Sequence, residues 1–332
     1  MSSGCKFILQ VVGITAGRII NHPSRFFPSD LISDVFLIKD GRPALVYTPS
    51  LECTGLVASG IDVLVAYCQD DYEMPYGDKC TYTIFLSIFK ENEENEQVIG
   101  INPKIAMELM ESVIEKDLIS VLPHVRYCKR NVAMKMEGKI DSCFSFAGMC
   151  EDNIPFIMEV SNVPFAEYNH GGDSAPSAPV GGSTPSAPVS GKADASSINE
   201  LLVTASPETG VEGGIPPTGV EGAEPPDEEM SPYDLKTAYF PEKGKKATPE
   251  MLKKIRELTL IKKESVTRCI LGFIIERTDI HRFEISLYDD EYRMAVKKAI
   301  ETGVDIVPVV VSWTKEGVAF FVTDELPVVF PH

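Results

Sequence analysis

Residues 167–230 restrict the possible folds of this chain more strongly than any other segment. They consist mainly of Ser, Ala, Pro, Gly and Glu, and they repeat Ser-Ala-Pro-Val and Thr-Gly-Val-Glu-Gly. Such a segment has too few large apolar side chains to offset the entropy of ordering its backbone. We therefore expect a disordered insertion that interrupts a folded domain of the 332-residue chain.

The insertion also accounts for more than half of the net negative charge. The chain has a net charge of −18, and residues 167–230 hold eleven acidic residues against one lysine, a balance of −10. Subtracting −10 from −18 leaves only −8 for the rest of the chain. Because net charge describes solubility rather than any one surface, the acidity does not exclude DNA as a partner.

The cysteine pattern, the short apolar runs and the N-terminal sequence indicate the cellular compartment. The eight cysteines are scattered and form no CxxC motif, which favours reduced thiols. No run approaches the roughly 18 apolar residues of a membrane span, and the N-terminus has no signal-peptide pattern. We expect a cytoplasmic protein, or a nuclear one if the source is eukaryotic, with no membrane association.

Residues 1–100 are rich in short β-type runs. The expected strands are 7–12, 35–38, 45–47, 63–67 and 82–89, and Asp40-Gly41 is typical of a hairpin turn. Five or six short antiparallel strands without a helical pattern indicate a small β-barrel, most simply an oligonucleotide-binding (OB) type.

The remaining folded parts, residues 101–166 and 231–332, alternate helix and strand patterns. Helices are expected near 102–119, 248–261 and 291–301. Strands are expected at 139–146, 154–160, 269–275, 305–313 and 318–322. This order predicts an α/β (α+β) domain with a mixed sheet flanked by helices, which the insertion interrupts without ending.

Two acidic residues stand in apolar surroundings. Asp141 begins an expected strand, and Glu159 lies within Phe-Ile-Met-Glu-Val. Two acids on adjacent strands can hold one Mg²⁺ or Mn²⁺ ion. The alternative is that Asp141 ends its strand in solvent while Glu159 pairs with a Lys or Arg.

Basic residues precede and follow this pair in the sequence, in stretches 126–139 and 243–263. Clustered Lys and Arg are typical of contacts with a phosphate backbone, although a solvated helix face gives the same pattern. The residues predicted to bind nucleic acid are Arg25, Arg126, Lys129, Arg130, Lys135, Lys139, Lys245, Lys246 and Lys254.

Several short motifs occur in the order found in one known family. They include Gly17-Arg18, Ser24-Arg25-Phe26-Phe27, Lys139-Ile140-Asp141, Met158-Glu159-Val160 and Tyr239-Phe240-Pro241. Their order and spacing resemble the sugar fermentation stimulation protein family over nearly the whole chain except the insertion. The resemblance implies an N-terminal OB-like barrel and a DNA-binding core of the restriction-endonuclease, or PD-(D/E)XK, type.

In that core the resemblance matches Asp141 and Glu159 to the two metal-binding acids. The expected motif lysine is absent, since Ser161 occupies its place, and Lys253 falls where a second lysine is expected. Because a hydroxyl carries no positive charge, either Lys253 or Lys254 substitutes or hydrolysis has been lost. The catalytic candidates are therefore Asp141, Glu159, Ser161 and Lys253.

We accordingly expect a DNA-binding protein with a nuclease-like site for Mg²⁺ or Mn²⁺. One alternative is an active metal-dependent nuclease. The other is an inert interaction module that recruits a protein partner through residues 167–230. The sequence leaves the oligomeric state and any DNA sequence preference undetermined.

Overall fold

The structure is a computed structural model of the chain. It describes residues 6–27, 29–49, 55–67, 80–90, 95–136, 138–168 and 236–330. The predicted disorder of the insertion falls almost entirely on residues outside these ranges. The described residues form a mixed α/β fold with three sheets, which agrees with the predicted fold class. Among them, no helix is both long and apolar enough to cross a membrane.

The first sheet contains six strands in the order β4-β3-β2-β5-β6-β7. They are β2 (Ile14–Asn21), β3 (Ile32–Leu37), β4 (Arg42–Tyr47), β5 (Asp62–Tyr67), β6 (Tyr82–Lys90) and β7 (Glu96–Gly100). β4 also pairs in parallel with β6, so strands β2 to β6 are linked in a closed ring of pairings. Val35, Val63 and Ile84 are fully buried inside this ring. The predicted turn at Asp40-Gly41 joins β3 to β4, and Gly41 has the positive φ of +63° that favours glycine.

The core sheet has seven strands in the order β1-β16-β15-β13-β10-β9-β8. They are β1 (Lys6–Gln10), β8 (Val125–Met136), β9 (Ile140–Cys150), β10 (Pro155–Asn162), β13 (Arg268–Ile275), β15 (Asp305–Trp313) and β16 (Val318–Thr323). β10, β13 and β15 are parallel neighbours, and the outer pairings are antiparallel. The predicted mixed sheet is therefore present.

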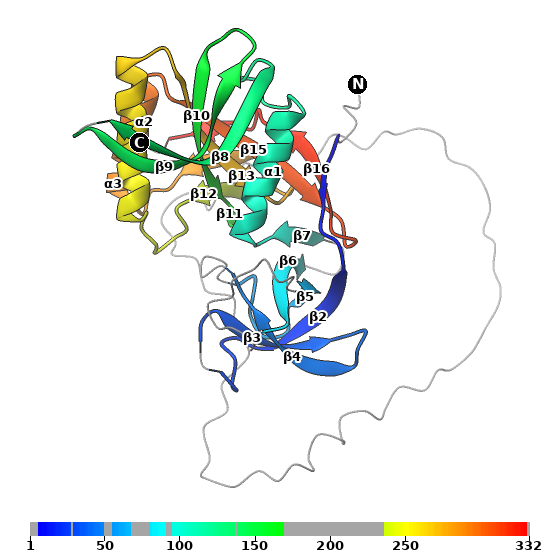
Figure 1. Ribbon diagram of the computed structural model, residues 1–332. Helices are drawn as coiled ribbons and strands as arrows, with labels where there is room; N and C mark the ends of the chain where they lie inside the picture. The colour runs from blue at the N-terminus through cyan, green and yellow to red at the C-terminus, as the bar shows by residue number, and fades with distance from the viewer. Residues whose placement is uncertain are drawn as a thin grey trace, which may run out of the picture. The chain divides into compact units, whose positions relative to one another are not determined.

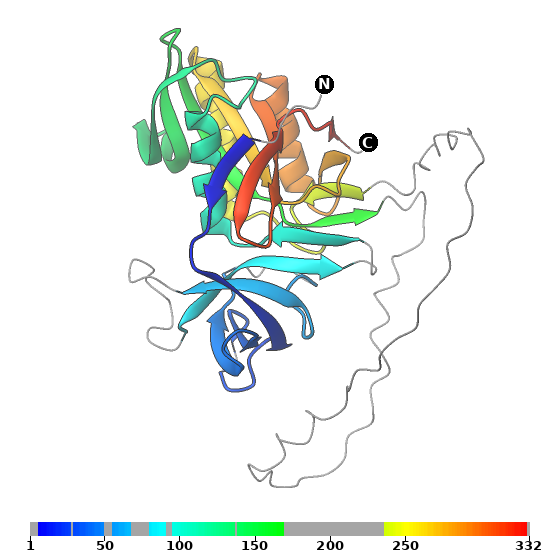
Figure 2. The ribbon, with the colours of Figure 1, turned by 90° about the vertical axis from the view of Figure 1, so that its right-hand side faces the viewer.

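One predicted strand belongs to a different sheet than we expected. The sequence pattern places the run 7–12 in the N-terminal barrel, but β1 pairs antiparallel with β16 of the core sheet, as the blue and red strands in Figure 2 show. Ile8 is buried in the same apolar cluster as Ala319. The alternation of apolar residues shows that a strand has one buried face, but it does not show which sheet supplies that face.

Three helices cover the core sheet: α1 (Pro103–Glu115), α2 (Pro249–Glu264) and α3 (Asp290–Glu301) (Figure 1). Successive residues of one strand join different apolar clusters. Met158 packs in the cluster that contains α1, whereas Ile157 packs in the cluster that contains α2 and α3. Because neighbouring side chains on a strand point to opposite faces, α1 lies on one face of the sheet and the other two helices lie on the opposite face.

A small sheet frames the insertion. Its order is β11-β12-β14-β17, with β11 (Ala166–Tyr168), β12 (Lys236–Phe240), β14 (Arg282–Ile285) and β17 (Val328–Val329). β11 and β12 pair antiparallel, with Tyr168 opposite Lys236. The two strands that flank residues 169–235 are thus hydrogen-bonded neighbours, so the fold continues across the insertion.

Candidate functional site

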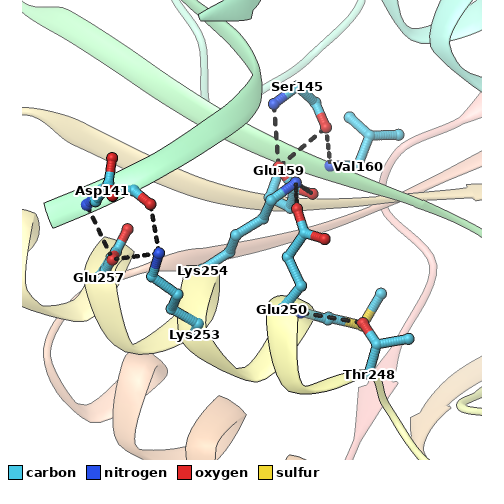
Figure 3. Close-up of polar contacts among 10 residues, drawn as sticks. Asp141, Ser145, Glu159, Val160, Thr248, Glu250, Lys253, Lys254 and Glu257 are labelled. Carbon is cyan, nitrogen blue, oxygen red and sulfur yellow. Dashed lines mark hydrogen bonds and ion pairs between the residues drawn. The ribbon is translucent and has the colours of Figure 1, made fainter. Parts of the chain in front are cut away.

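Glu159 is a buried acid on the interior strand β10, with its side chain facing α2 (Figure 3). Its Oε1 accepts a hydrogen bond from Lys254 Nζ at 2.9 Å. The side chains are 10% exposed for Glu159 and 16% for Lys254. Ion pairing with a lysine is the alternative that the sequence left open, and the pair offsets the cost of burying the carboxylate.

Ser145 of β9 supplies the other partners of Glu159. Its backbone N–H and its hydroxyl donate to Glu159 Oε2 at 3.0 and 3.1 Å. The same hydroxyl oxygen accepts a hydrogen bond from the Val160 N–H at 3.0 Å. A serine therefore occupies the position on the adjacent strand that faces Glu159. The sequence alone does not identify Ser145, because a serine within an apolar strand does not indicate a site until the strand register shows what it faces.

Asp141 lies elsewhere on β9, and its carboxylate has a different environment. The side chain is 72% exposed and is 3.5 Å from Lys135 Nζ. Asp141 is four residues from Ser145, a distance of about 13 Å along a strand. The structure thus places the two predicted metal-binding acids beside different partners, and their shared ion stays a prediction.

The backbone of Asp141 connects β9 to α2. Its N–H donates to Glu257 Oε1 at 3.2 Å, and Lys253 Nζ donates to its carbonyl oxygen (Figure 3). Glu257 is 7% exposed, and its Oε2 has no hydrogen-bond partner among the described residues. Sequence reasoning missed this buried glutamate because it stands in a lysine-rich helix and reads there as a solvated charge.

The other two catalytic candidates also lie on these elements. Ser161 follows Glu159 on β10, is half-buried and stands opposite Phe273 of β13. Lys253 is 49% exposed and is 3.7 Å from Glu257. Of the two lysines proposed as substitutes, Lys254 is therefore the one that contacts Glu159, while Lys253 contacts Asp141 and Glu257.

The two basic stretches, far apart in sequence, meet at this place. Lys139 Nζ donates to Glu264 at the end of α2 at 2.7 Å, and Lys253 of α2 contacts Asp141. Lys135 on the exposed strand β8 is 81% exposed. β8 was missed from the sequence, since its charged residues obscure the alternation expected of a strand.

The remaining predicted nucleic-acid-binding residues are exposed or paired. Lys129, Arg126 and Lys246 are exposed, Arg130 pairs with Glu111 of α1, and Lys245 is 3.1 Å from Glu242. Arg25 lies apart from this surface, in the connection between β2 and β3, where its backbone N–H donates to Asp34.

Another buried acid directly follows β13. Glu276 is fully buried and accepts one hydrogen bond, from the Trp313 indole N–H at 2.8 Å. Burial raises the pKa of Glu276 to about 8, although the Trp313 hydrogen bond opposes this rise. The backbone carbonyl of Glu276 accepts from Gly100 of the first sheet at 3.2 Å. Glu276 therefore lies where β7 meets the core.

Asp279, three residues further on, behaves in the opposite way. Burial raises its pKa, but hydrogen bonds and charges from Arg277 and Lys236 outweigh that effect and hold the pKa at about 2. Arg277 donates to both carboxylate oxygens at 2.7 Å, and Lys236 donates at 2.8 Å. This cluster fastens the start of β12 to the end of β13.

The described residues bring together no group of three or more His, Cys, Asp or Glu side chains that could hold a metal ion. Around Glu159, the groups within hydrogen-bonding distance are an ammonium, a hydroxyl and a backbone N–H. All three donors are directed at the Glu159 carboxylate, so both of its oxygens already have partners within the chain.

A seven-stranded mixed sheet with helices on both faces, together with a six-stranded sheet of short strands, defines a mixed α/β protein. Residues 232–317 match the family model described as the sugar fermentation stimulation protein RE domain. The predicted resemblance to that family is thereby confirmed. No curated protein matches the chain.

A solved structure has a similar fold over a longer range. The structure of Pyrococcus furiosus SfsA in complex with Ca²⁺ is similar to this chain with a TM-score of 0.58 and 14% sequence identity. The similarity covers 97% of this chain and 99% of that chain. At this identity the likeness shows the shared fold.

Proposed function

We propose that this protein binds DNA through its sugar–phosphate backbone, on a surface formed by β8, the start of β9 and α2. The observation that carries this proposal is the meeting of two basic stretches, 126–139 and 243–263, through the contacts of Lys139 and Lys253. The fold shared with the sugar fermentation stimulation family supports it. Clustered Lys and Arg side chains are the usual source of non-specific DNA affinity.

The proposal does not include metal-dependent hydrolysis. The Ca²⁺ in the Pyrococcus protein raises the question of an ion here, and we predicted Mg²⁺ or Mn²⁺ at Asp141 and Glu159. The donor groups around Glu159 do not fit such an ion, because Ser145 and Lys254 already occupy both carboxylate oxygens. An active nuclease is therefore the less favoured alternative, and the interaction module depends on residues outside the described ranges.

The test is a fluorescence-anisotropy titration of labelled single- and double-stranded DNA at increasing KCl concentrations. For the wild type we expect log K to fall linearly with log salt. Lys135→Ala should reduce the slope by about 1, as expected for one lost phosphate contact. Lys298→Ala on α3 is a matched control, since Lys298 is 61% exposed and also lies beside an acid, Glu301.

The outcomes separate clearly. An unchanged slope in the control together with a reduced slope in Lys135→Ala supports the proposed surface. Equal slopes in both variants would move the DNA contact elsewhere on the molecule. If wild-type protein binds neither form of DNA at low salt, the proposed function fails.

A further inference from the structure

Both oxygens of Glu159 accept hydrogen bonds from groups of the same chain. Oε2 accepts from the Ser145 N–H and hydroxyl, and Oε1 accepts from the Lys254 ammonium at 2.9 Å. The two side chains of the ion pair are 10% and 16% exposed. This largely buried carboxylate therefore already has a cation beside it, as a buried charge requires.

A divalent ion would meet an unsuitable environment at this place. Mg²⁺ and Mn²⁺ are bound by oxygen ligands that usually include one or two carboxylates. Ser145 stands where a second carboxylate would be needed, and its hydroxyl is already engaged with Glu159 and Val160. The ion would find one carboxylate and would face the Lys254 ammonium, which repels it.

Lys254 Nζ has a second, weaker partner on the side that faces away from Glu159, which we call its outer side. Glu250, one helical turn earlier on α2, has a carboxylate oxygen 3.7 Å from Lys254 Nζ and a side chain that is 75% exposed. That distance is too long for a hydrogen bond. An ammonium has three N–H donors, so Lys254 can keep Glu159 and still donate to a second anion.

From these contacts we propose that the Lys254 ammonium takes the place of a divalent cation beside Glu159 and donates on its outer side to a DNA phosphate. Glu250 turns into solvent when the phosphodiester oxygen arrives. DNA binding at this site is then independent of metal. The claim about the cation stands on the contacts alone, whereas the claim about the phosphate rests on the proposed function.

Calorimetric titration of Mn²⁺ into metal-free, full-length protein tests the cation. We expect no binding at Glu159, so that wild type and Glu159→Gln give the same heats. The double variant Ser145→Asp with Lys254→Ala restores two adjacent carboxylates, and we expect it to bind Mn²⁺. If it unfolds without metal, recovery of its circular dichroism on adding Mn²⁺ is the readout. Wild-type Mn²⁺ binding that Glu159→Gln abolishes would overturn the proposal.

DNA titrations in EDTA and in Mn²⁺, at equal ionic strength, test the phosphate. We expect equal affinities in both buffers and an affinity about two- to fivefold higher for Glu250→Gln, because an exposed competing charge is removed. Glu291→Gln is the matched control, since Glu291 is 63% exposed and pairs with Arg256. Lys254→Arg should retain binding, as it keeps the charge.

Failures of the two proposals are distinguishable. Wild-type binding that requires Mn²⁺, or equal gains for Glu250→Gln and Glu291→Gln, would overturn the role of Lys254 while DNA binding itself stands. No DNA binding in either buffer would remove the proposed function and the phosphate contact, while the Mn²⁺ calorimetry would still decide the cation.

Discussion

Two buried glutamates, one on β10 and one directly after its parallel neighbour β13, have opposite surroundings. Glu159 on β10 has three donors within hydrogen-bonding distance, one of them an ammonium. Glu276, which follows β13, has only the Trp313 N–H among the described residues, and its Oε1 has no partner there. Donors surround the Glu159 carboxylate, whereas burial raises the pKa of Glu276 and favours its neutral form.

The comparison separates burial from function. A strongly raised pKa in a protein interior often marks an active site, and by that criterion Glu276 would be selected. Yet Glu276 contacts Trp313 and Gly100 where the first sheet meets the core, and it pairs with no Lys or Arg among the described residues. Glu159, in contrast, pairs with Lys254 of the lysine-rich helix α2.

The largest expected effect comes from the titration of Glu276. Because its folded-state pKa of about 8 lies above the ordinary value of 4.5, the folded protein keeps a proton that the unfolded chain releases between these pH values. This stabilisation is fully present below pH 4.5 and is lost as the pH rises to about 8. Relative to wild type, Glu276→Gln should therefore gain stability progressively as the pH rises through this range, up to roughly 5 kcal/mol.

Urea denaturation of both proteins at a series of pH values measures this difference. The free energy of unfolding of Glu291→Gln, a change at an exposed acid, should depend on pH in the same way as that of wild type. If Glu276→Gln also runs parallel to wild type, Glu276 is ionised in the folded protein and the contrast with Glu159 disappears.

The next effect concerns the ion pair. Lys254→Met leaves the Glu159 carboxylate buried without its cation, and we expect a loss of about 3 kcal/mol in the free energy of unfolding. Lys253→Met, at the adjacent half-exposed lysine, should cost less than about 1 kcal/mol. Chemical denaturation measures both losses. Equal losses would show that the ion pair with Glu159 stabilises the protein no more than the contacts of the half-exposed Lys253 do.

A smaller effect is expected on the Glu276 side. A Cβ atom at Gly100 would overlap the Glu276 carboxyl group, so Gly100→Ala should destabilise the protein by about 2 kcal/mol. Gly272→Ala is the control, because its Cβ meets the flexible end of Met110 at 2.8 Å. Thermal unfolding should show the larger loss of stability for Gly100→Ala. The reverse order would show that the Glu276 side chain can move away from a Cβ at position 100.

The smallest effect is expected at the other predicted acid. Asp141 is exposed and lies beside an exposed lysine, so Asp141→Asn should change the free energy of unfolding by less than about 0.5 kcal/mol. Glu159→Gln should cost clearly more, because it leaves the largely buried Lys254 without its counter-ion. Similar costs in denaturation experiments would contradict the difference in burial between the two acids.

The sequence predicted most elements of the core sheet and all three helices, because their apolar periodicity is strong. It did not predict β8, whose strand is covered with charged residues, or the partner of β1. At the site it identified Glu159 from a charge within an apolar run. It matched Asp141 to the second acid from the Ile-Asp motif, whereas the strand register places Ser145 opposite Glu159. Register depends on tertiary pairing, which local patterns do not contain.

The pairing of β1 with β16 has a consequence for the order of events during protein synthesis. β1 leaves the ribosome before any strand of the first sheet, but its partner emerges nearly a whole chain later. Because domains fold as they are made, from the N-terminus onward, the first sheet can form before β1 has its partner strand. During synthesis, the backbone N–H and C=O groups of β1 therefore stay unpaired with β16 until β16 has been translated.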